Sequence, residues 1–210
     1  MIHICDNFFK DPYSVRSIAL KEKYVTERFN YPGLRSFNVP KEVSDQILSY
    51  VRYLTKNSSL KLTSSSFQSI MQEFGDGIYH QDRAYDYLCM IYLSLDSPLN
   101  SGTEICGDDE DRPDHIWANW DGHGDKIRNL FHEDPFNLIN RYRYGRIRKK
   151  INSYYQPDFI ASNKFNRCVI FPSHNFHRAQ NFFGTSLENS RLTIVSFISE
   201  HQIGPLQSLR

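Results

Sequence analysis

The sequence predicts a mainly β fold with α-helices flanking it on the N-terminal side. Strand-length runs of apolar and β-branched residues lie at 87–95, 168–171 and 191–198, and such runs are typical of buried strands. In the N-terminal part, apolar residues recur at helical spacing instead. A chain of 210 residues can bury a sizeable core as one unit, so we expect a single domain over 1–210.

Two helices are expected in the N-terminal part. Asp11 and Pro12 supply an N-cap and a proline at the first helical position. A second helix is expected to start near Pro40 and to end at Asn57–Ser59. Their apolar stripes are Val15, Ile18 and Ala19 in the first helix, and Val43, Ile47, Val51 and Leu54 in the second. We expect residues 1–64 to form a helical brace that packs outside the larger sheet.

Turn residues separate the expected strands. A turn signal at Asp76-Gly77 comes shortly before His80. The turn residues 97–102 then separate the strand at 87–95 from a short strand at 103–106. The histidine, the hairpin and the later strands therefore belong to one β-rich unit.

Two histidines and one aspartate are candidate metal ligands. Residues i and i+2 share a face of a β-strand, so a strand through His80 and Asp82 would aim both side chains at one point. A histidine from a distant strand would complete a 2-His-1-carboxylate set, and both His174 and His177 follow the strand at 168–171. Such a set leaves coordination positions open and suits non-haem Fe(II). A surface His–Asp pair near a turn is the alternative, because the chain has 8 histidines.

Arg191 opens the last strand and is a candidate anchor for an anion. Its planar guanidinium can hold a carboxylate through two hydrogen bonds, such as the far carboxylate of a dicarboxylate cosubstrate. Thr193 shares the same face of the strand and can offer a hydroxyl to the same carboxylate. Arg167 and Arg178 compete with Arg191, although Arg178 should point to the opposite face from its neighbour His177.

Four segments stand in a characteristic order: HQD, IYLSLDSPLNSGTEI, NRCVIFPSHNFHRA and SRLTIVSFI. Together, over residues 65–200, they resemble the 2-oxoglutarate/Fe(II)-dependent dioxygenase superfamily, near its prolyl-hydroxylase-like branch. The resemblance implies a double-stranded β-helix, a cupin-like jelly roll of two opposed antiparallel sheets. Residues 65–106 and 160–200 would form the core barrel, with both histidine-bearing segments at one open end. Ser101-Gly102 departs from the two glycines that are commoner in the family.

The resemblance implies that His80, Asp82 and His177 bind Fe(II). His177 is preferred to His174 because FHRA after an apolar strand and a turn is the closer match to the family. The implied reaction consumes 2-oxoglutarate and O2, releases succinate and CO2, and hydroxylates an unactivated C–H bond. Retention of Asp82 argues against halogenation, which in relatives accompanies loss of the carboxylate ligand.

The resemblance also implies a binding site for 2-oxoglutarate. Arg191 would anchor its C5 carboxylate, with Thr193 assisting. Tyr92 is a further candidate for this site, but the register of its strand could place either Tyr92 or Ile91 inward.

Residues 107–159 form an insertion between the two halves of the expected barrel. The insertion opens with the acidic segment Gly107–Asp111, and Arg141–Lys150 carries cations among tyrosines. A charge run is usually a solvated helix face; the alternative is a lid or substrate-binding wall, and the two charged stretches could also pair with each other. The histidines of the insertion have no metal-ligand spacing and are expected at the surface; they are His115, His123 and His132.

The composition of the chain indicates which partners and which cellular location to expect. The formal net charge is +1, so nucleic acid is not an expected partner, and no apolar run approaches the roughly 20 residues that span a bilayer. The segment after Met1 lacks the basic start and apolar core of a signal peptide. The cysteines form no CxxC pair, which favours buried thiols in a reducing cytoplasm; they are Cys5, Cys89, Cys106 and Cys168. The sequence indicates neither an oligomeric state nor whether the primary substrate is a small molecule, a peptide or a nucleotide.

Two other functions stay open. A cupin-like metal-binding protein would share the barrel but use no 2-oxoglutarate, and Arg191 distinguishes the two because the cosubstrate needs that anchor. A non-catalytic domain kept for its surface would need no metal ligands, so the intact set of His80, Asp82 and His177 argues against it.

Overall fold

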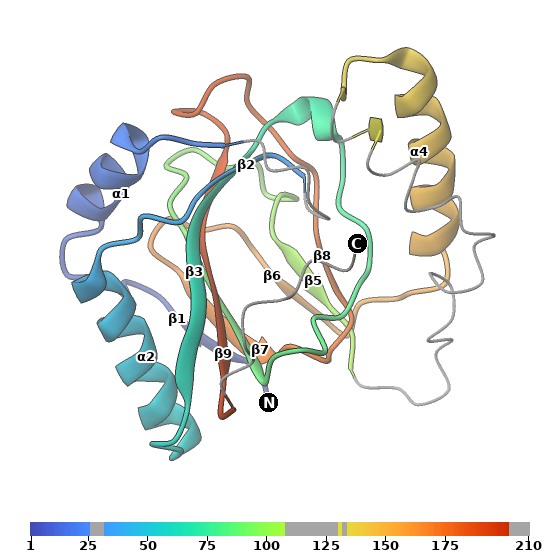
Figure 1. The fold of residues 1–210 in the computed structure, drawn as a ribbon. Coiled ribbons are helices and arrows are strands. Elements are labelled where there is room, and N and C mark those ends of the chain that lie inside the picture. Colours follow the sequence, from blue (N-terminus) through green and yellow to red (C-terminus); the bar gives the residue numbers. More distant parts are fainter. Residues whose placement is uncertain (26–31, 108–129, 132–133, 202–210) are drawn as a thin grey trace.

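Two antiparallel sheets form the body of the protein in the computed structural model, which describes residues 1–25, 32–107, 130–131 and 134–201. The larger sheet has the strand order β1-β7-β4-β9-β3-β2 and the smaller has the order β6-β5-β8 (Figure 1). The strands of the larger sheet are β1 (His3–Cys5), β7 (Cys168–Pro172), β4 (Tyr87–Tyr92), β9 (Arg191–Ser199), β3 (Lys61–Ile70) and β2 (Leu34–Ser36). Those of the smaller sheet are β6 (Phe159–Ala161), β5 (Thr103–Ile105) and β8 (His177–Ala179).

The two sheets enclose a buried interior. Met90 of β4 and Val195 of β9 pack in one cluster with Ile105 and Ala161 of the smaller sheet. Two antiparallel sheets that face each other in this way form a jelly roll. The predicted fold class, mainly β with a double-stranded β-helix, is therefore confirmed.

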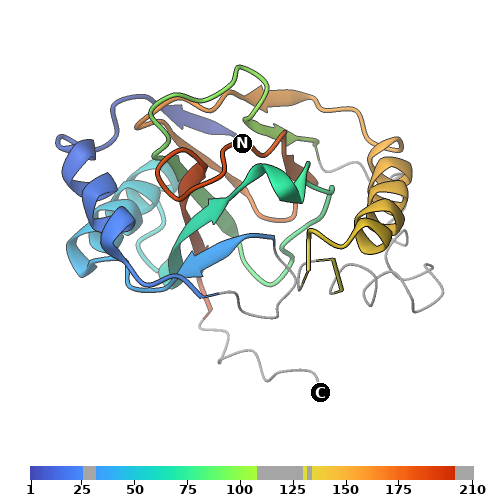
Figure 2. The same ribbon diagram turned by 90° about the horizontal axis from the view of Figure 1, so that it is seen from above.

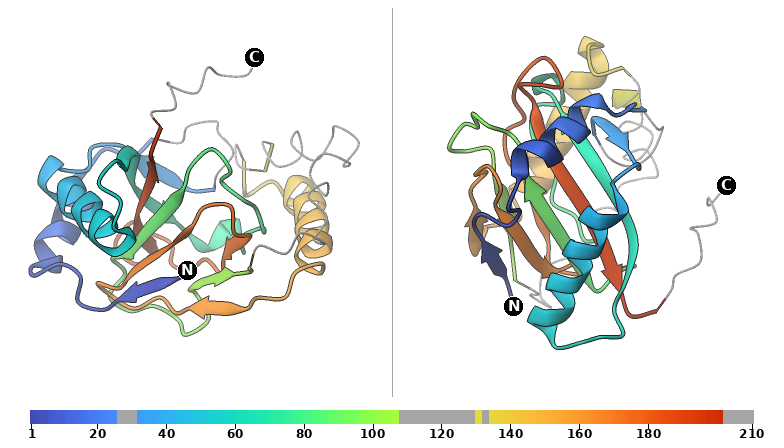
Figure 3. Two further views of the ribbon diagram at one scale, coloured as in Figure 1. Left: turned by 90° about the horizontal axis from the view of Figure 1, so that it is seen from below. Right: turned by 90° about the vertical axis from the view of Figure 1, so that its left-hand side faces the viewer.

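Two helices cover the outer face of the larger sheet, as expected. They are α1 (Pro12–Lys21) and α2 (Lys41–Thr55), and both lie in front of its strands in the right-hand view of Figure 3. Ala19 of α1 and Ile47 of α2 have no exposed surface and pack in one cluster with Ile194 of β9. This outer cluster is separate from the interior between the sheets, so β9 supports a core on each of its faces.

The start of α1 follows the predicted capping pattern. The Asp11 carboxylate accepts a hydrogen bond from the Ser14 backbone N–H at 3.1 Å, and Pro12 is the first helical residue. The second helix begins directly after Pro40, and Lys56 ends it in the left-handed conformation. Both helix positions could be predicted because caps and prolines are local signals.

The N-terminal segment also supplies strands that the sequence analysis did not assign. The edge strands β1 and β2 have three residues each, and β3 is a ten-residue strand paired with β9 along its length. In β3, hydroxyls facing α1 and α2 bond across to β9 or to the residue before it: Ser65 to Ser196 at 2.8 Å and Ser69 to Ser190 at 2.6 Å. Serines that satisfy one another across strands produce no hydrophobic alternation, so the pattern hid this strand.

The described part of the insertion is mainly helix α4 (Leu138–Asn152), which lies on the far side of the molecule from α1 and α2 (Figure 2). Its side chains Tyr144, Ile147 and Ile151 are buried, whereas most of its cations are exposed. The expected solvated helix face is therefore present. The acidic residues 108–111 and the three histidines of the insertion lie outside the described residues. A short 3-10 helix, η1 (Gln72–Phe74), lies close to α4.

The thiols of Cys89, Cys106 and Cys168 are buried and that of Cys5 is partly buried, all in the free form.

Among the residues that the structure describes, no helix combines the length and the apolar character that crossing a membrane requires.

Candidate metal centre

The loop that carries His80 runs beside β8. The Gly77 N–H donates to the Ala179 carbonyl at 3.0 Å, and a side chain at position 77 would collide with that carbonyl, so glycine is needed there. His80 and His177 form an isolated antiparallel bridge, with N–H to carbonyl distances of 3.1 and 3.0 Å. The Asp82 N–H donates to the Ser173 carbonyl at 2.9 Å. The expectation that His80 and Asp82 lie on a regular strand is therefore wrong. Within this motif, His80 alone forms a β-bridge, and Asp82 is not part of a strand.

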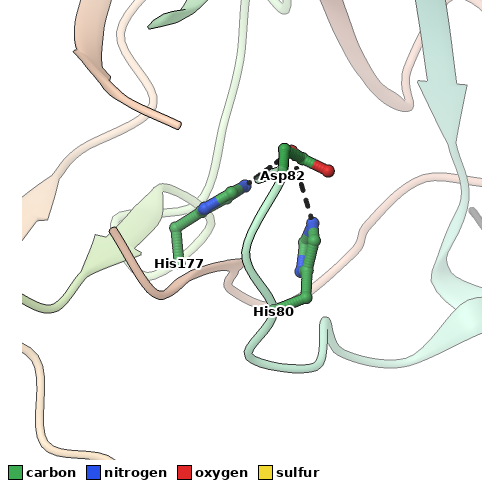
Figure 4. A group of neighbouring side chains, drawn as sticks. All are labelled: His80, Asp82 and His177. Carbon is green, nitrogen blue, oxygen red and sulfur yellow. Dashed lines mark ion pairs between the residues drawn. The ribbon is translucent and has the colours of Figure 1, made fainter. Parts of the chain in front are cut away.

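The three expected ligands meet nonetheless. The Asp82 Oδ2 atom lies 3.4 Å from His177 Nε2 and 3.9 Å from His80 Nε2 (Figure 4). One nitrogen or oxygen atom from each residue lies within 4.8 Å of the others, which is the spacing of ligands around a single ion. Two imidazole nitrogens and one carboxylate oxygen suit a divalent transition metal with open coordination positions. The residues present therefore fit a metal such as Fe(II).

A backbone carbonyl orients each imidazole. His80 Nδ1 lies 2.9 Å from the carbonyl of Ile78, and His177 Nδ1 lies 2.9 Å from the carbonyl of Asn175. Because a carbonyl only accepts, each Nδ1 carries a proton, so in the neutral form of each imidazole the Nε2 lone pair is available on the side of Asp82. This is the arrangement that outer partners impose on metal-binding histidines.

The centre opens toward solvent on one side. The side chains of His80, Asp82 and His177 are 44%, 24% and 6% exposed. Burial acts to raise the pKa of Asp82. When the imidazoles are protonated, the hydrogen bond from His177 Nε2 and the charges of His80, His177 and Arg35 outweigh burial and lower the pKa to about 2. The carboxylate is thus ionised at neutral pH and ready to act as a ligand.

The rival distal histidine lies elsewhere. His174 is exposed and is not among the clustered ligand atoms. Its backbone carbonyl accepts a hydrogen bond from Gln81 Nε2. His177 instead packs its ring 4.9 Å from that of Phe171, on the interior side of the jelly roll.

Arg191 lies in the interior between the sheets and is 1% exposed. Its Nη2 donates to Thr103 Oγ1 at 3.1 Å, and its Cζ lies 5.5 Å from the centre of the Tyr92 ring. Burial lowers its pKa. Among the described residues no carboxylate pairs with it. Because an unpaired buried charge is strongly unfavourable, the surroundings of Arg191 suit an anionic ligand.

The other expected cosubstrate residues adjoin Arg191. Thr193 is fully buried, and its Oγ1 has no hydrogen-bond partner within the described part of the chain. Tyr92 faces the interior and Ile91 faces the helices, which settles the register. The Tyr92 hydroxyl donates to Thr103 Oγ1 at 2.8 Å. An orphaned hydroxyl two residues along the strand from a guanidinium without a carboxylate partner among the described residues is what a bound carboxylate could satisfy.

The competing arginines have carboxylate partners of their own. Arg178 lies on the opposite face of β8 from His177, as expected, and pairs with Glu104 and with Asp76, the latter at 2.6 Å. Arg167 pairs with Asp6 at 2.6 Å. Arg191 is therefore the better candidate of the three for an anion anchor.

Sequence reasoning missed several residues around Arg191. Thr103 contacts both Arg191 and Tyr92, while the Met90 sulfur and the Ser101 carbonyl also approach the guanidinium. Thr103 was detectable in principle, because it opens a short strand directly after the hairpin turn. The other two contacts depend on how the two sheets face each other, which no local pattern encodes.

Sequence comparison finds no matching family model and no matching curated protein. Solved structures do match. HygX from Streptomyces hygroscopicus, solved with nickel and 2-oxoglutarate bound, aligns with a TM-score of 0.57 over 94% of this chain and 82% of that one, at 14% identity. A prolyl-4-hydroxylase from Pseudomonas putida aligns with a TM-score of 0.53 over 95% of this chain and 92% of that one, at 13% identity.

The chain shares the fold of 2-oxoglutarate/Fe(II)-dependent oxygenases. It also matches a 2OG-Fe(II) oxygenase family protein from Burkholderia pseudomallei, but spans about half of it (51%), at 9% identity and a TM-score of 0.44. Identities this low establish the common fold alone. What this chain does must follow from its own residues.

Proposed function

We propose that this protein is an Fe(II)- and 2-oxoglutarate-dependent oxygenase. One observation carries the proposal: a 2-His-1-carboxylate set and a buried arginine with no carboxylate partner among the described residues border the same interior. The first suits a metal with open positions. The second suits a carboxylate that arrives with a ligand.

Each residue has a distinct part in the proposed reaction. His80, Asp82 and His177 would hold Fe(II), while Arg191 and Thr193 would hold the C5 carboxylate of 2-oxoglutarate. When bound, the metal and its cosubstrate supply the oxidising power of O2 for hydroxylation of a C–H bond, with succinate and CO2 as co-products. The carbonyls of Ile78 and Asn175 hold the Nδ1 protons, so that Nε2 is the atom each histidine would offer to the metal.

Two other functions are less well supported. A cupin-like metal protein without 2-oxoglutarate chemistry would have no use for a buried unpaired guanidinium. A non-catalytic domain would not need three ligand atoms within 4.8 Å of one another. Arg191 argues against the first alternative, and the ligand set argues against the second.

The domain organisation proposed is a single oxygenase domain over 1–210. In it residues 1–64 brace the larger sheet, 65–106 and 160–200 form the barrel, and 107–159 are an insertion or lid. The primary substrate stays open between small molecules, peptides and nucleotides. HygX has been solved with hygromycin B bound, which is a property of that protein.

Anaerobic Fe(II) titration tests the metal site. We expect one ion per chain in the wild type and loss of binding in His80→Ala and His177→Ala, because each removes a ligand. His174→Ala is the matched control and should bind as the wild type does, since His174 is exposed and outside the cluster.

Unchanged iron binding in His177→Ala would contradict the ligand assignment. For the oxygenase activity, succinate release from 2-oxoglutarate should be screened against free amino acids, peptides and nucleotides. A substrate should stimulate succinate release in the wild type and not in the ligand variants.

A further inference from the structure

The loop that leads into His80 lies between β8 and helix α4. On one side it makes the backbone bonds to Ala179 and His177 described above. On the other side, the Asn152 side chain donates from Nδ2 to the Gly77 carbonyl at 2.9 Å and accepts at Oδ1 from the Tyr79 N–H at 3.1 Å. These two bonds are the ones that a further β-strand would make, so one amide side chain at the end of α4 substitutes for a strand.

Arg148, one turn earlier in α4, holds the preceding part of the same loop. Its Nη1 donates to the carbonyls of Phe74 and Asp76, both at 2.8 Å. Gly75 between them has φ +74, and a side chain there would lie 2.8 Å from the guanidinium. The glycine is therefore needed both for the backbone conformation and for the approach of Arg148.

Ile78 lies between the two residues that Asn152 binds, and its carbonyl contacts the candidate ligand His80. Asn152 binds the backbone of Gly77 and of Tyr79, and Ile78 lies between them. The Ile78 carbonyl accepts the hydrogen bond from His80 Nδ1 at 2.9 Å. A fixed carbonyl fixes the tautomer and the direction of the imidazole, so a continuous set of contacts leads from α4 to His80 Nε2.

We propose that Asn152 and Arg148 are positioning residues for the metal centre, and that α4 thereby sets how His80 presents its Nε2 atom. This inference rests on the proposed metal-binding function. Loss of an outer partner of a metal ligand weakens metal affinity about 10–100-fold. Asn152 does not contact His80 itself but holds the backbone around its partner Ile78. We therefore expect metal affinity to weaken by the lower end of this range, about tenfold.

The variant Asn152→Asp tests the clamp without changing side-chain volume. Its carboxylate can accept from the Tyr79 N–H but cannot donate to the Gly77 carbonyl. Mn(II) alone is titrated into the full-length protein, with free Mn(II) measured by its EPR signal. We expect about tenfold weaker binding, and the same direction in Asn152→Ala. The fold should persist, because the Tyr79 hydroxyl is still bonded to Glu104.

Asn166 offers a matched control. Its amide also donates once and accepts once, here with the carbonyl and the N–H of the single residue Phe9, both at 2.9 Å, on the side of the molecule that α1 covers. Asn166→Gly accepts the positive φ of this position and removes an equivalent clamp. Its Mn(II) affinity should stay within about twofold of the wild type, since distant sites act independently.

A second readout separates positioning from general destabilisation. In the metal-free protein, nitrogen NMR shifts should show His80 mainly as the Nδ1–H tautomer in the wild type and in Asn166→Gly, and as a mixture in the Asn152 variants. Variants of Asn152 that fold, bind Mn(II) as tightly as the wild type and keep the His80 tautomer would overturn the positioning role alone. A wild type that binds no Mn(II) would overturn the metal site and this inference together.

Discussion

Two backbone carbonyls decide how the candidate ligands are presented. Each histidine donates its Nδ1 proton to the carbonyl two residues earlier, Ile78 for His80 and Asn175 for His177. The same local arrangement thus occurs in two unrelated segments. In the neutral imidazoles it leaves two Nε2 lone pairs beside one carboxylate, so a metal competes only with the Nε2 protons and not with those on Nδ1.

The pKa of Asp82 reports how its neighbours stabilise the carboxylate. Burial opposes ionisation, yet the pKa is lowered from 3.8 to about 2, chiefly by the hydrogen bond from His177. A lowered carboxylate pKa contributes stability that is present above pH 3.8 and is lost as the pH falls through about 2. In His177→Ala the carboxyl pKa should rise, because burial then acts without that bond. Carbon NMR of the Asp82 carboxyl group in the metal-free protein measures both values.

Wild-type stability should accordingly fall more steeply on acidification below pH 3.8 than that of Asp82→Asn. Acid unfolding monitored by circular dichroism gives the comparison. Parallel curves for the two proteins, or a carboxyl pKa unaffected by loss of His177, would show that the bond does not hold the charge of Asp82.

At the scale of elements, the sequence predicts what local patterns encode. The start of α1, the stripe of α2 and the apolar strands β4, β7 and β9 are where capping and hydrophobic runs place them. The strand β3 was missed because its serines pair with hydroxyls at and beside β9. The bridge at His80 replaces the regular strand expected there. Both differences come from contacts between distant segments, which periodicity does not report.

Helix α4 permits a test of whether the described part of the insertion is scaffold or lid. Three of its side chains are buried, and Arg148 and Asn152 bind the loop before His80. We expect its amides from Tyr144 to Ile151 to be protected from hydrogen exchange without any ligand, to a degree similar to α2. Exchange as fast as in an open helix, slowed only by added metal and 2-oxoglutarate, would mean that this helix moves as a lid instead.

In the whole molecule, the two faces of the larger sheet have different roles: one stabilises the fold and the other borders the candidate site. One face carries the apolar cluster under α1 and α2, and the other carries Met90, Tyr92 and Arg191 toward the smaller sheet. Strand β9 alternates between them, so Leu192 and Ile194 stabilise the fold while Arg191 and Thr193 border the interior. The candidate anion site could be predicted because Arg191 and Thr193 stand at positions i and i+2 of one strand and so share a face. The absence of a carboxylate partner for Arg191 among the described residues, which makes the site functional in our account, required the structure.

Arg191 is proposed to hold the C5 carboxylate of 2-oxoglutarate. Calorimetric titration of 2-oxoglutarate into Mn(II)-loaded protein tests it without turnover, with Arg167→Ala as a control because that guanidinium pairs with Asp6 instead. Truncating one partner of a buried charge pair costs about 2–5 kcal/mol, so Arg191→Ala should bind about thirtyfold more weakly or worse. Arg191→Lys should be intermediate, because lysine keeps the charge but loses the planar fork. Mn(II) affinity should hardly change. A wild type that does not bind 2-oxoglutarate, or an Arg191→Ala variant that binds it equally well, would contradict the account.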